Sequence, residues 1–490
     1  MTPALIRGYE VVIGLETHAQ LSTASKIFSG APTAFGAAPN TQASVVDLAL
    51  PGTLPVLNRG AVERAIRFGL AVGGHIAPLS IFARKNYFYP DLPKGYQISQ
   101  YELPLATGGV VAAHSDHWAP DYDIRITRIH MEEDAGKLLH EGFLDSDRRS
   151  HVDLNRAGTP LIEIVTEPDF RRARHAAAFF GYLRELLVAI GANDGNMEEG
   201  SLRCDANVSV RKPGAPLGTK AEIKNLNSFR FLEEAIEYEV ARQAELLETG
   251  ERVVQETRLW DPGAKRTVSM RSKEEAHDYR YFPEPDLPPL VVLPARIDAL
   301  RATMPELPAV WRRRLVEVHQ LTASDASSLT EVRPSLGRYF EDTVRAGADP
   351  KAAKNWVLGL VSAKLNELGL GDAGPLAEKI PASNLAALLA LIDKGTISGS
   401  MAKDVFEKMF VSGRTADAVV AAEGLAQIDD ESQIVALIAE ALAANPGPVA
   451  DFRGGKASAF GFLVGKVMKA AGGKANPKRV NELLKRALEA

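Results

Sequence analysis

At 490 residues, with 46% hydrophobic and 24% charged residues, the chain can bury a large core and is expected to hold about three domains. The net charge of −5 excludes a polycation of the histone type, and the single cysteine, Cys204, excludes an internal disulfide and argues against an oxidising compartment. Because the sequence shows neither a signal-peptide pattern nor an apolar run of the roughly 18 residues that a membrane span requires, it predicts a cytoplasmic protein without membrane contact.

The first predicted strand carries a polar face. Residues Tyr9–Leu15 form a short β-branched strand, and the segment that follows alternates polar and apolar residues, which places Glu16, His18 and Gln20 on one side. A glutamate and a histidine two positions apart on a strand can reach the same metal ion. A structural or exposed pair is the alternative.

Residues 82–102 mix basic and aromatic side chains. Arg84 and Lys85 precede three aromatic residues at positions 87–89 and a turn with two prolines. Cations bind phosphates and rings stack on bases, so the mixture suits a nucleotide or the end of a nucleic acid. An aromatic hairpin that packs on the core would explain the same residues.

An acidic cluster follows a predicted strand at residues 122–130. His130, Glu132, Glu133 and Asp134 place one imidazole and three carboxylates within five positions. Adjacent carboxylates repel each other, and a hard cation such as Mg²⁺, its shell completed by substrate phosphates, would compensate their charge. A solvated acidic turn is the alternative.

Another acid lies inside the predicted strand Leu161–Val165, which a polar turn at residues 153–160 precedes. This acid, Glu163, is expected to be buried or half-buried, and a buried carboxylate needs a partner. Residues 198–211 then bring Glu199, Arg203 and Asp205 before a further strand. Glu163 therefore favours the cation over the solvated turn.

Helices are predicted at three places in this part of the chain. Asn58 is expected to cap the first, Arg171–Ile190 forms the second, and Ser228 is expected to cap a long third helix. Together with the predicted strands they indicate a mixed α/β domain.

The composition changes near residue 293. Beyond a proline-rich segment, alanine and leucine dominate and helix periodicity is continuous. We expect an α+β protein with a catalytic domain at residues 1–293, a helical domain at 294–408 and a small helical tail at 409–490. Residues 451–490 hold nine Lys/Arg against three Asp/Glu, which suggests contact with a polyanion.

Several nucleotide-binding and hydrolytic motifs are absent from the sequence. There is no P-loop, no GxGxxG after a strand, no nucleophile elbow, no HExxH and no paired CxxC. If the chain uses ATP, it does so through a site of carboxylates and basic side chains.

Ten stretches resemble one family, the B subunits of the bacterial aspartyl/glutamyl-tRNA amidotransferases. They are VIGLETHAQL at 12–21, LALPGTLPVLN at 48–58, RKNYFYPDLPKGYQISQYE at 84–102, HMEEDAGK at 130–137, DLNRAGTPLIEIVTEPD at 153–169, EGSLRCDANVS at 199–209, EIKNLNSF at 222–229, DYRYFPEPDLPPL at 278–290, GTISGSMAKDVFEKM at 395–409 and ASAFGFLVGKVMKAAGGKANPKRVNELL at 457–484. The resemblance covers most of the first domain and the tail.

The resemblance implies a cradle-shaped catalytic domain followed by a helical domain and a tail. It implies ATP- and Mg²⁺-dependent phosphorylation of the side-chain carboxylate of misacylated Glu-tRNA(Gln) or Asp-tRNA(Asn). Ammonia then displaces the phosphate and leaves an amide. The ammonia would come from the A subunit, a glutaminase, and a small C subunit would complete a heterotrimer.

The resemblance and the residues together yield a set of candidate site residues. The candidate metal ligands are Glu16, His18, Glu132, Glu133, Glu163, Glu199 and Asp205. Glu133 and Lys85 are the catalytic candidates, and Arg84 and Lys85 are expected to bind nucleotide phosphate or transition-state charge. The basic tail residues expected to hold tRNA phosphates are Arg453, Lys456, Lys466, Lys469, Lys474 and Lys478.

Two rival hypotheses remain at this point. In one, the chain only binds tRNA, its acids are structural and activation takes place elsewhere. In the other, it is a stand-alone carboxylate–amine ligase for a small molecule, which would not need the basic helical tail.

Overall fold

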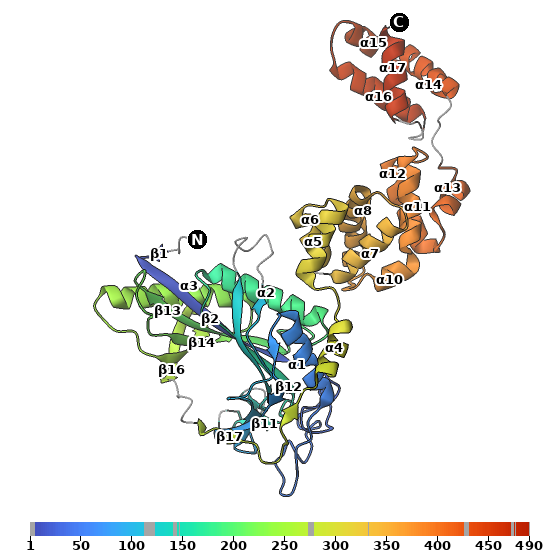
Figure 1. The fold of residues 1–490 in the computed structure, drawn as a ribbon. Helices are drawn as coiled ribbons and strands as arrows, with labels where there is room; N and C mark the ends of the chain where they lie inside the picture. The colour runs from blue at the N-terminus through green and yellow to red at the C-terminus, as the bar shows by residue number, and fades with distance from the viewer. Residues whose placement is uncertain are drawn as a thin grey trace. The chain divides into compact units, whose positions relative to one another are not determined.

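The computed structural model (Figure 1) describes residues 5–111, 123–140, 145–146, 148–272, 279–331, 333–425, 431–471, 475 and 477–489. The chain divides into two compact units, residues 1–311 and residues 312–490, and each is described by itself. The first unit mixes strands and helices, whereas the second is helical, which confirms the predicted α+β class.

An eleven-stranded sheet dominates the described part of the first unit. Its strands are β1 (Leu5–Ile6), β2 (Tyr9–Gln20), β3 (His75–Ile76), β7 (Ala106–Thr107), β8 (Val110–Val111), β9 (Ile124–Glu133), β12 (Pro160–Thr166), β13 (Leu202–Arg211), β14 (Ala221–Leu226), β15 (Glu256–Asp261) and β16 (Arg266–Ser272). The main path runs β16-β15-β14-β13-β2-β12-β9-β7-β3, with β1 beside β2 and β8 beside β9. Neighbouring strands are antiparallel except β14 and β15.

One face of this sheet is apolar and packs on helices. Along β2, Ile13 and Leu15 are buried in a core that also takes side chains from α1 (Arg59–Ala71), α2 (Ala173–Ala189) and α3 (Phe229–Glu248). Because side chains alternate along a strand, Glu16 and His18 emerge on the opposite face. The sequence pattern of β2 thus separates the core from the polar face.

The helix ends agree with the predicted caps. The Asn58 side chain accepts a hydrogen bond from the backbone N–H of Gly60, and Ser228 Oγ accepts one from the backbone N–H of Phe231 at 3.0 Å, which confirms both caps. The second helix begins two residues later than predicted, since Arg172 is extended and makes no side-chain cap.

The acidic cluster lies within a strand. The strand predicted at residues 122–130 continues to Glu133, because Leu161 and Pro160 of β12 pair with Glu132 and Glu133. Glu132, Glu133 and the following Asp134 are all buried. The alternative prediction of a solvated acidic turn is therefore wrong.

Three smaller sheets complete the strands of the first unit. They consist of β17 (Phe282–Pro283), β5 (Ala83–Asn86) and β6 (Tyr96–Ser99) in that order, of β10 (Lys137–Leu139) with β11 (His151–Asp153), and of β18 (Leu290–Val291) with β4 (Leu79–Ser80). Strand β6 contacts β9, which brings the basic and aromatic segment to the acidic cluster. Helix α4 (Pro294–Ala302) packs against α1.

The second unit contains helices throughout its described residues. These are α5 (Pro308–His319, which begins in the first unit), α6 (Ala323–Thr330), α7 (Pro334–Arg345), α8 (Pro350–Trp356), a π-helical turn η2 (Val357–Val361), α9 (Ser362–Glu367), α10 (Gly374–Lys379), α11 (Ala382–Asp393), α12 (Gly399–Ser412), α13 (Ala416–Glu423), α14 (Glu431–Ala443), α15 (Pro446–Arg453), α16 (Ser458–Ala470) and α17 (Pro477–Glu489). The domain boundary predicted at residue 408 falls inside α12.

The last four helices share a core of their own. Leu463 and Val467 of α16 pack with Ile434 and Ile438 of α14 and with Leu484 of α17. Within the described residues, no one helix has both the length and the apolar character to cross a membrane. Only α14 and α15 taken together, with a bend of 94° between them, meet those two criteria.

Candidate functional site

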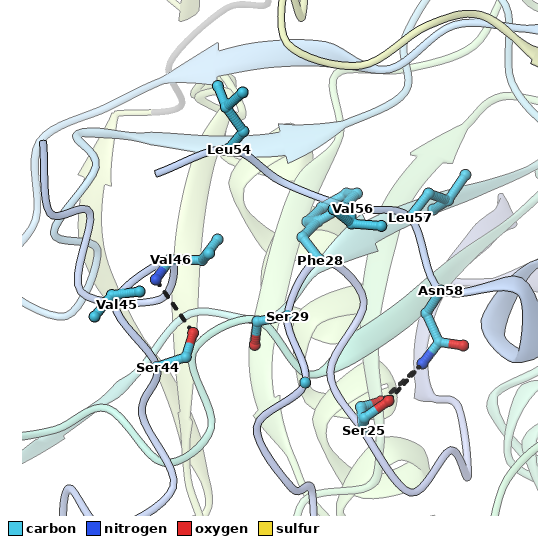
Figure 2. Close-up of a pocket in the computed structure, with 11 residues that line it drawn as sticks. Ser25, Phe28, Ser29, Ser44, Val45, Val46, Leu54, Val56, Leu57 and Asn58 are labelled. Carbon is cyan, nitrogen blue, oxygen red and sulfur yellow. Dashed lines mark hydrogen bonds between the residues drawn. The ribbon is translucent and has the colours of Figure 1, made fainter. Parts of the chain in front are cut away.

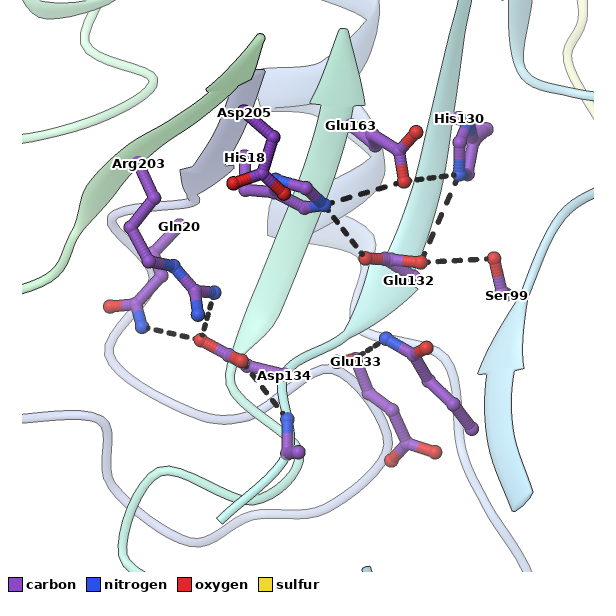
Figure 3. Close-up of polar contacts among 12 residues, drawn as sticks. His18, Gln20, Ser99, His130, Glu132, Glu133, Asp134, Glu163, Arg203 and Asp205 are labelled. Atoms are coloured by element: carbon purple, nitrogen blue, oxygen red, sulfur yellow. Dashed lines mark hydrogen bonds and ion pairs between the residues drawn. The ribbon is translucent and has the colours of Figure 1, made fainter. Parts of the chain in front are cut away.

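Four neighbouring strands place four ionisable side chains in one row across the sheet. In the order β9-β12-β2-β13, His130 pairs with Glu163, Glu163 with His18, and His18 with Arg203. Side chains that are paired across antiparallel strands emerge on the same face. The row is therefore assembled from four separate segments of sequence by strand register alone, and Figure 3 shows His18, Glu163 and His130 converging while the Arg203 guanidinium lies beside Asp134.

Glu163 lies at the centre of this row. Its Oε2 atom is 3.4 Å from His18 Nε2 and 3.3 Å from His130 Nε2. Glu132, two residues beyond His130 on the same face of β9, approaches the same two imidazoles at 4.0 and 3.8 Å. Ser99 Oγ of β6 donates a hydrogen bond to Glu132 at 3.1 Å and fixes that carboxylate.

This arrangement offers a set of metal ligands. One ligand atom each from His18, Glu132 and Glu163 lie within 4.8 Å of one another. We call these three residues the ligand cluster. Two carboxylates and an imidazole fit a divalent cation. Nδ1 of the neighbouring His130 is buried without a hydrogen-bond partner among the described residues, so this imidazole is incompletely satisfied.

The electrostatics of the ligand cluster show the same need for positive charge. Burial alone would lower the pKa of His18, but its contact with Glu163, with Asp205 and Glu132 nearby, dominates and raises the pKa to about 9. Burial would raise the pKa of Glu163, yet His130 and His18 hold it well below the usual range. Without a cation, a protonated His18 offsets one of the two carboxylate charges of the ligand cluster.

Glu16 and Asp205 form the next row of the sheet, where they are paired across β2 and β13. Asn207 Nδ2 donates to Glu16 Oε1 at 2.8 Å, and Lys224 Nζ of β14 lies 2.6 Å from Asp205 Oδ2. Burial opposes the charge on Lys224, but Asp205 and Glu222 raise its pKa above the usual value. Both predicted ligands border the ligand cluster and have protein partners.

Asp134 anchors a second group of polar side chains beside the ligand cluster. Its Oδ2 accepts hydrogen bonds from Gln20 Nε2 at 2.8 Å and from Arg203 Nη2 at 2.9 Å, and Arg156 Nε lies 3.7 Å away. Burial would raise the pKa of Asp134, but Arg203 and Arg156 lower it. Asp134 is therefore ionised and shared between two arginines.

The structure does not bring Glu133 into the ligand cluster. Alternation along β9 turns its side chain to the face opposite Glu132, where it forms an ion pair with Lys94 and accepts a hydrogen bond from the backbone N–H of Ile98 at 2.8 Å. Burial raises the pKa of Glu133 against the opposing effect of Lys94. Figure 3 shows the Glu133 side chain directed away from the ligand cluster, on the other side of the strand from Glu132.

The two predicted phosphate-binding cations differ in their surroundings. Arg84 makes two hydrogen bonds to Glu284, at 2.8 and 2.7 Å, and one to Asp286. Lys85 Nζ has no hydrogen-bond or ion-pair partner in the described part of the chain and lies 5.0 Å from the centre of the Tyr279 ring. Burial would lower the pKa of Lys85, but Glu132 and Glu163 help to raise it. Lys85 is the available cation.

The remaining predicted site residues lie elsewhere. Glu199 is in the turn before β13, and no contact joins its carboxylate to the ligand cluster within the described residues. In the tail, Arg453, Lys456, Lys466 and Lys469 are exposed, and Lys456 pairs with Asp451. Lys474 lies outside the described residues, as does the side chain of Lys478.

A separate pocket of about 560 Å³ opens in the loop before α1, and its lining residues are not those of the ligand cluster (Figure 2). Its walls include Phe28, Val46 and Leu57, with Ser25 and Asn58 at one end. Among the described residues, none of the predicted site residues lines it.

Sequence reasoning missed several residues that support the site. Ser99, Lys94 and Asn207 each hold one of the predicted acids, and His130 was noted but not assigned a role. Strand alternation from Glu132 to His130 would have identified the histidine. The three partners become apparent only when the strands are paired.

Comparison with known proteins covers both halves of the chain. The family described as the GatB/GatE catalytic domain matches residues 11–298, and the family described as the GatB domain matches residues 338–488. Three similar proteins are each named as the B subunit of an aspartyl/glutamyl-tRNA(Asn/Gln) amidotransferase. The protein from Ralstonia nicotianae is 59% identical and that from Bordetella petrii 58%, each over 98% of this chain and 99% of the relative. The protein from Variovorax paradoxus is 54% identical over 99% and 100% of the two chains.

Proposed function

The chain belongs to the family of B subunits of the tRNA-dependent aspartyl/glutamyl amidotransferase, a glutamine-hydrolysing ligase of protein biosynthesis, and from this premise we propose that the ligand cluster is where the substrate carboxylate is activated. The observation that carries the proposal is the convergence of His18, Glu132 and Glu163 from three strands to within 4.8 Å. Buried carboxylates this close require a compensating charge, and a divalent cation that accompanies the nucleotide would provide one.

The proposed reaction has two steps. An oxygen of the side-chain carboxylate of Glu-tRNA(Gln) or Asp-tRNA(Asn) attacks the γ-phosphorus of ATP, the bond from that phosphorus to the β–γ bridging oxygen breaks, and ADP leaves with the electron pair. Ammonia then attacks the acyl carbon, phosphate leaves and a proton is lost, which yields the amide. Because both reactants in the first step are anions, catalysis depends on neutralising charge and holding them in line.

The residues of the site would have different roles in this reaction. Mg²⁺, when bound, would neutralise phosphate charge, and the ligand cluster would hold it, with Glu16 and Asp205 in the adjoining row. Lys85, which is free of carboxylate contacts among the described residues, would bind a phosphate oxygen. Glu133 would act by holding Lys94.

The proposed partners follow from the chemistry that this sequence lacks. No glutaminase nucleophile motif is present, so the ammonia would come from the glutaminase, the A subunit of the complex, and a small C subunit would complete a heterotrimer. The exposed tail residues Arg453, Lys466 and Lys469 would bind the tRNA backbone. The basic excess of residues 451–490 supports this assignment.

The proposal is tested with Glu132→Gln in the reconstituted complex, supplied with misacylated tRNA, ATP and free ammonia. Glutamine keeps the volume but removes a charge from the ligand cluster, so amide formation is expected to fall by about a hundredfold or more, while tRNA binding is retained. Unchanged amide formation would show that the acids are structural.

A matched control lies on β2. Glu10 is also buried and is paired with Arg171 at 2.9 Å and Arg211 at 2.7 Å, but it is outside the ligand cluster. Glu10→Gln is expected to lower thermal stability and to retain amide formation in the folded complex. Equal losses in both variants would attribute the effect of Glu132→Gln to destabilisation.

A further inference from the structure

Arg203 is the cationic member of the cross-strand row, and the proposed function leaves it without a role. It is paired with His18 across β13 and β2, so its side chain emerges on the same face as the ligand cluster. Figure 3 shows its guanidinium beside Asp134 and below His18 and Asp205.

The guanidinium of Arg203 is anchored at one end only. Nη2 donates to Asp134 Oδ2 at 2.9 Å, whereas Nε is buried and makes no hydrogen bond to the described residues. The side chain as a whole is 37% exposed, so part of it is reachable from solvent. A buried donor without a partner is costly, and an arginine held at one end keeps donors for a ligand.

The charges around Arg203 leave it able to bind an anion. Asp134 also has Arg156 within 3.7 Å, so Arg203 alone does not neutralise this carboxylate. Lys224 is held by Asp205 at 2.6 Å and Glu222 at 3.5 Å, and Arg84 is held by Glu284 and Asp286. On the β13 side of the ligand cluster, Arg203 is therefore the described cation with donors to spare.

From this geometry we propose that Arg203 binds the phosphoryl group that is transferred to the substrate carboxylate. The proposal rests on the proposed function, because it assumes that phosphoryl transfer takes place at the ligand cluster. A guanidinium offers two parallel N–H donors that match two phosphoryl oxygens, and such a contact strengthens as charge develops on them. Asp134 orients Arg203 and is a positioning residue.

The first test compares Arg203→Gln, Arg203→Lys and Asp134→Asn in the reconstituted complex with free ammonia. Arg203→Gln is expected to lower kcat for amide formation by about a hundredfold or more. Lysine keeps the charge but not the fork, so its loss should be smaller. Asp134→Asn keeps the arginine, so its kcat for amide formation should fall less than that of Arg203→Gln. An equal fall in kcat would show that Arg203 serves only to pair with Asp134.

A second readout does not depend on catalysis. Binding of ADP and of a non-hydrolysable ATP analogue is measured with each variant. If Arg203 contacts the γ-phosphoryl group, Arg203→Gln weakens binding of the ATP analogue by about tenfold or more and weakens binding of ADP much less. Equal weakening of both ligands, or of neither, would overturn the proposal.

Chemical rescue separates this role from a structural one. Arg203→Ala leaves a space beside Asp134, and added guanidinium ion at millimolar concentration is expected to restore part of the lost amide formation. Failure of rescue in a variant that still folds and binds ADP would count against the proposal. Glu132→Gln is measured in parallel. If Glu132→Gln and the Arg203 variants all retain amide formation, the proposed function fails. If Glu132→Gln loses amide formation but the Arg203 variants retain it, only this inference fails.

Discussion

His18 links pH to stability and, in the proposed function, to metal binding. Its pKa in the folded protein is raised from 6.5 to about 9. A group whose pKa is raised on folding stabilises the folded state while it is protonated. The contribution of His18 is therefore fully present below about pH 6.5 and is lost as the pH rises through about 9.

The first prediction concerns the proton on His18. An imidazole must be neutral to bind a metal, so a divalent cation that binds to the ligand cluster at pH 7.5 must displace this proton. We expect proton release on Mg²⁺ binding and an apparent affinity that rises with pH until about 9. Calorimetry in buffers with different ionisation enthalpies measures the release.

The control for this measurement is His18→Gln. The variant removes the titrating group and should abolish most of the proton release. If the native complex binds Mg²⁺ without releasing a proton, His18 is not a ligand.

At the scale of elements, the buried Lys26 pairs with Asp47 within the loop before α1 and also ties this loop to the turn before β12 by a hydrogen bond. Lys26 Nζ lies 3.2 Å from Asp47 Oδ2 and 3.3 Å from the carbonyl oxygen of Leu154, and Lys26 and Asp47 are both buried. Asp47 also accepts hydrogen bonds from the backbone N–H of Ser44 and from the Ser29 hydroxyl.

The second prediction is that Lys26→Met loosens this loop. Removing one partner of a buried pair leaves an uncompensated charge, which costs about 3–5 kcal/mol. We expect faster amide hydrogen exchange across residues 22–58, measured by mass spectrometry. Lys26→Met with Asp47→Leu removes both charges and should exchange more slowly than the single variant; if the single variant exchanges like the native chain, the pair does not hold the loop.

The elements also show how much the sequence could predict. The polar face of β2 follows from alternation, and the caps at Asn58 and Ser228 follow from local chemistry; these predictions agree with the structure. The extent of β9 could not be predicted from the sequence. Glu132 and Glu133 have low strand propensity and belong to a strand only because they pair with β12. The same long-range pairing turns the two acids to opposite faces and aligns Arg203 with His18.

At the scale of the whole molecule, the chain combines an acidic net charge of −5 with a basic tail, and the proposed function gives the ligand cluster and the tail different ligands. The ligand cluster concentrates carboxylates that need a cation, while Lys466 and Lys469 of α16 are exposed and can meet phosphates. A long-range attraction to tRNA by the tail would be screened by salt, whereas the buried cluster would be little affected.

The last prediction follows from this difference. Replacing Lys466 and Lys469 together by glutamine is expected to weaken tRNA binding and to reduce the slope of log affinity against log salt concentration by about 1.4–1.8, since each phosphate contact contributes about 0.7–0.9. The kcat at saturating tRNA should stay unchanged, because neither residue touches the reacting atoms. The matched control is Lys408→Gln, an exposed lysine of the same unit whose charge is already paired with Glu423 at 2.6 Å. If Lys408→Gln reduced the salt-dependence slope equally, the result would show that the tail lysines do not contact the tRNA phosphates specifically.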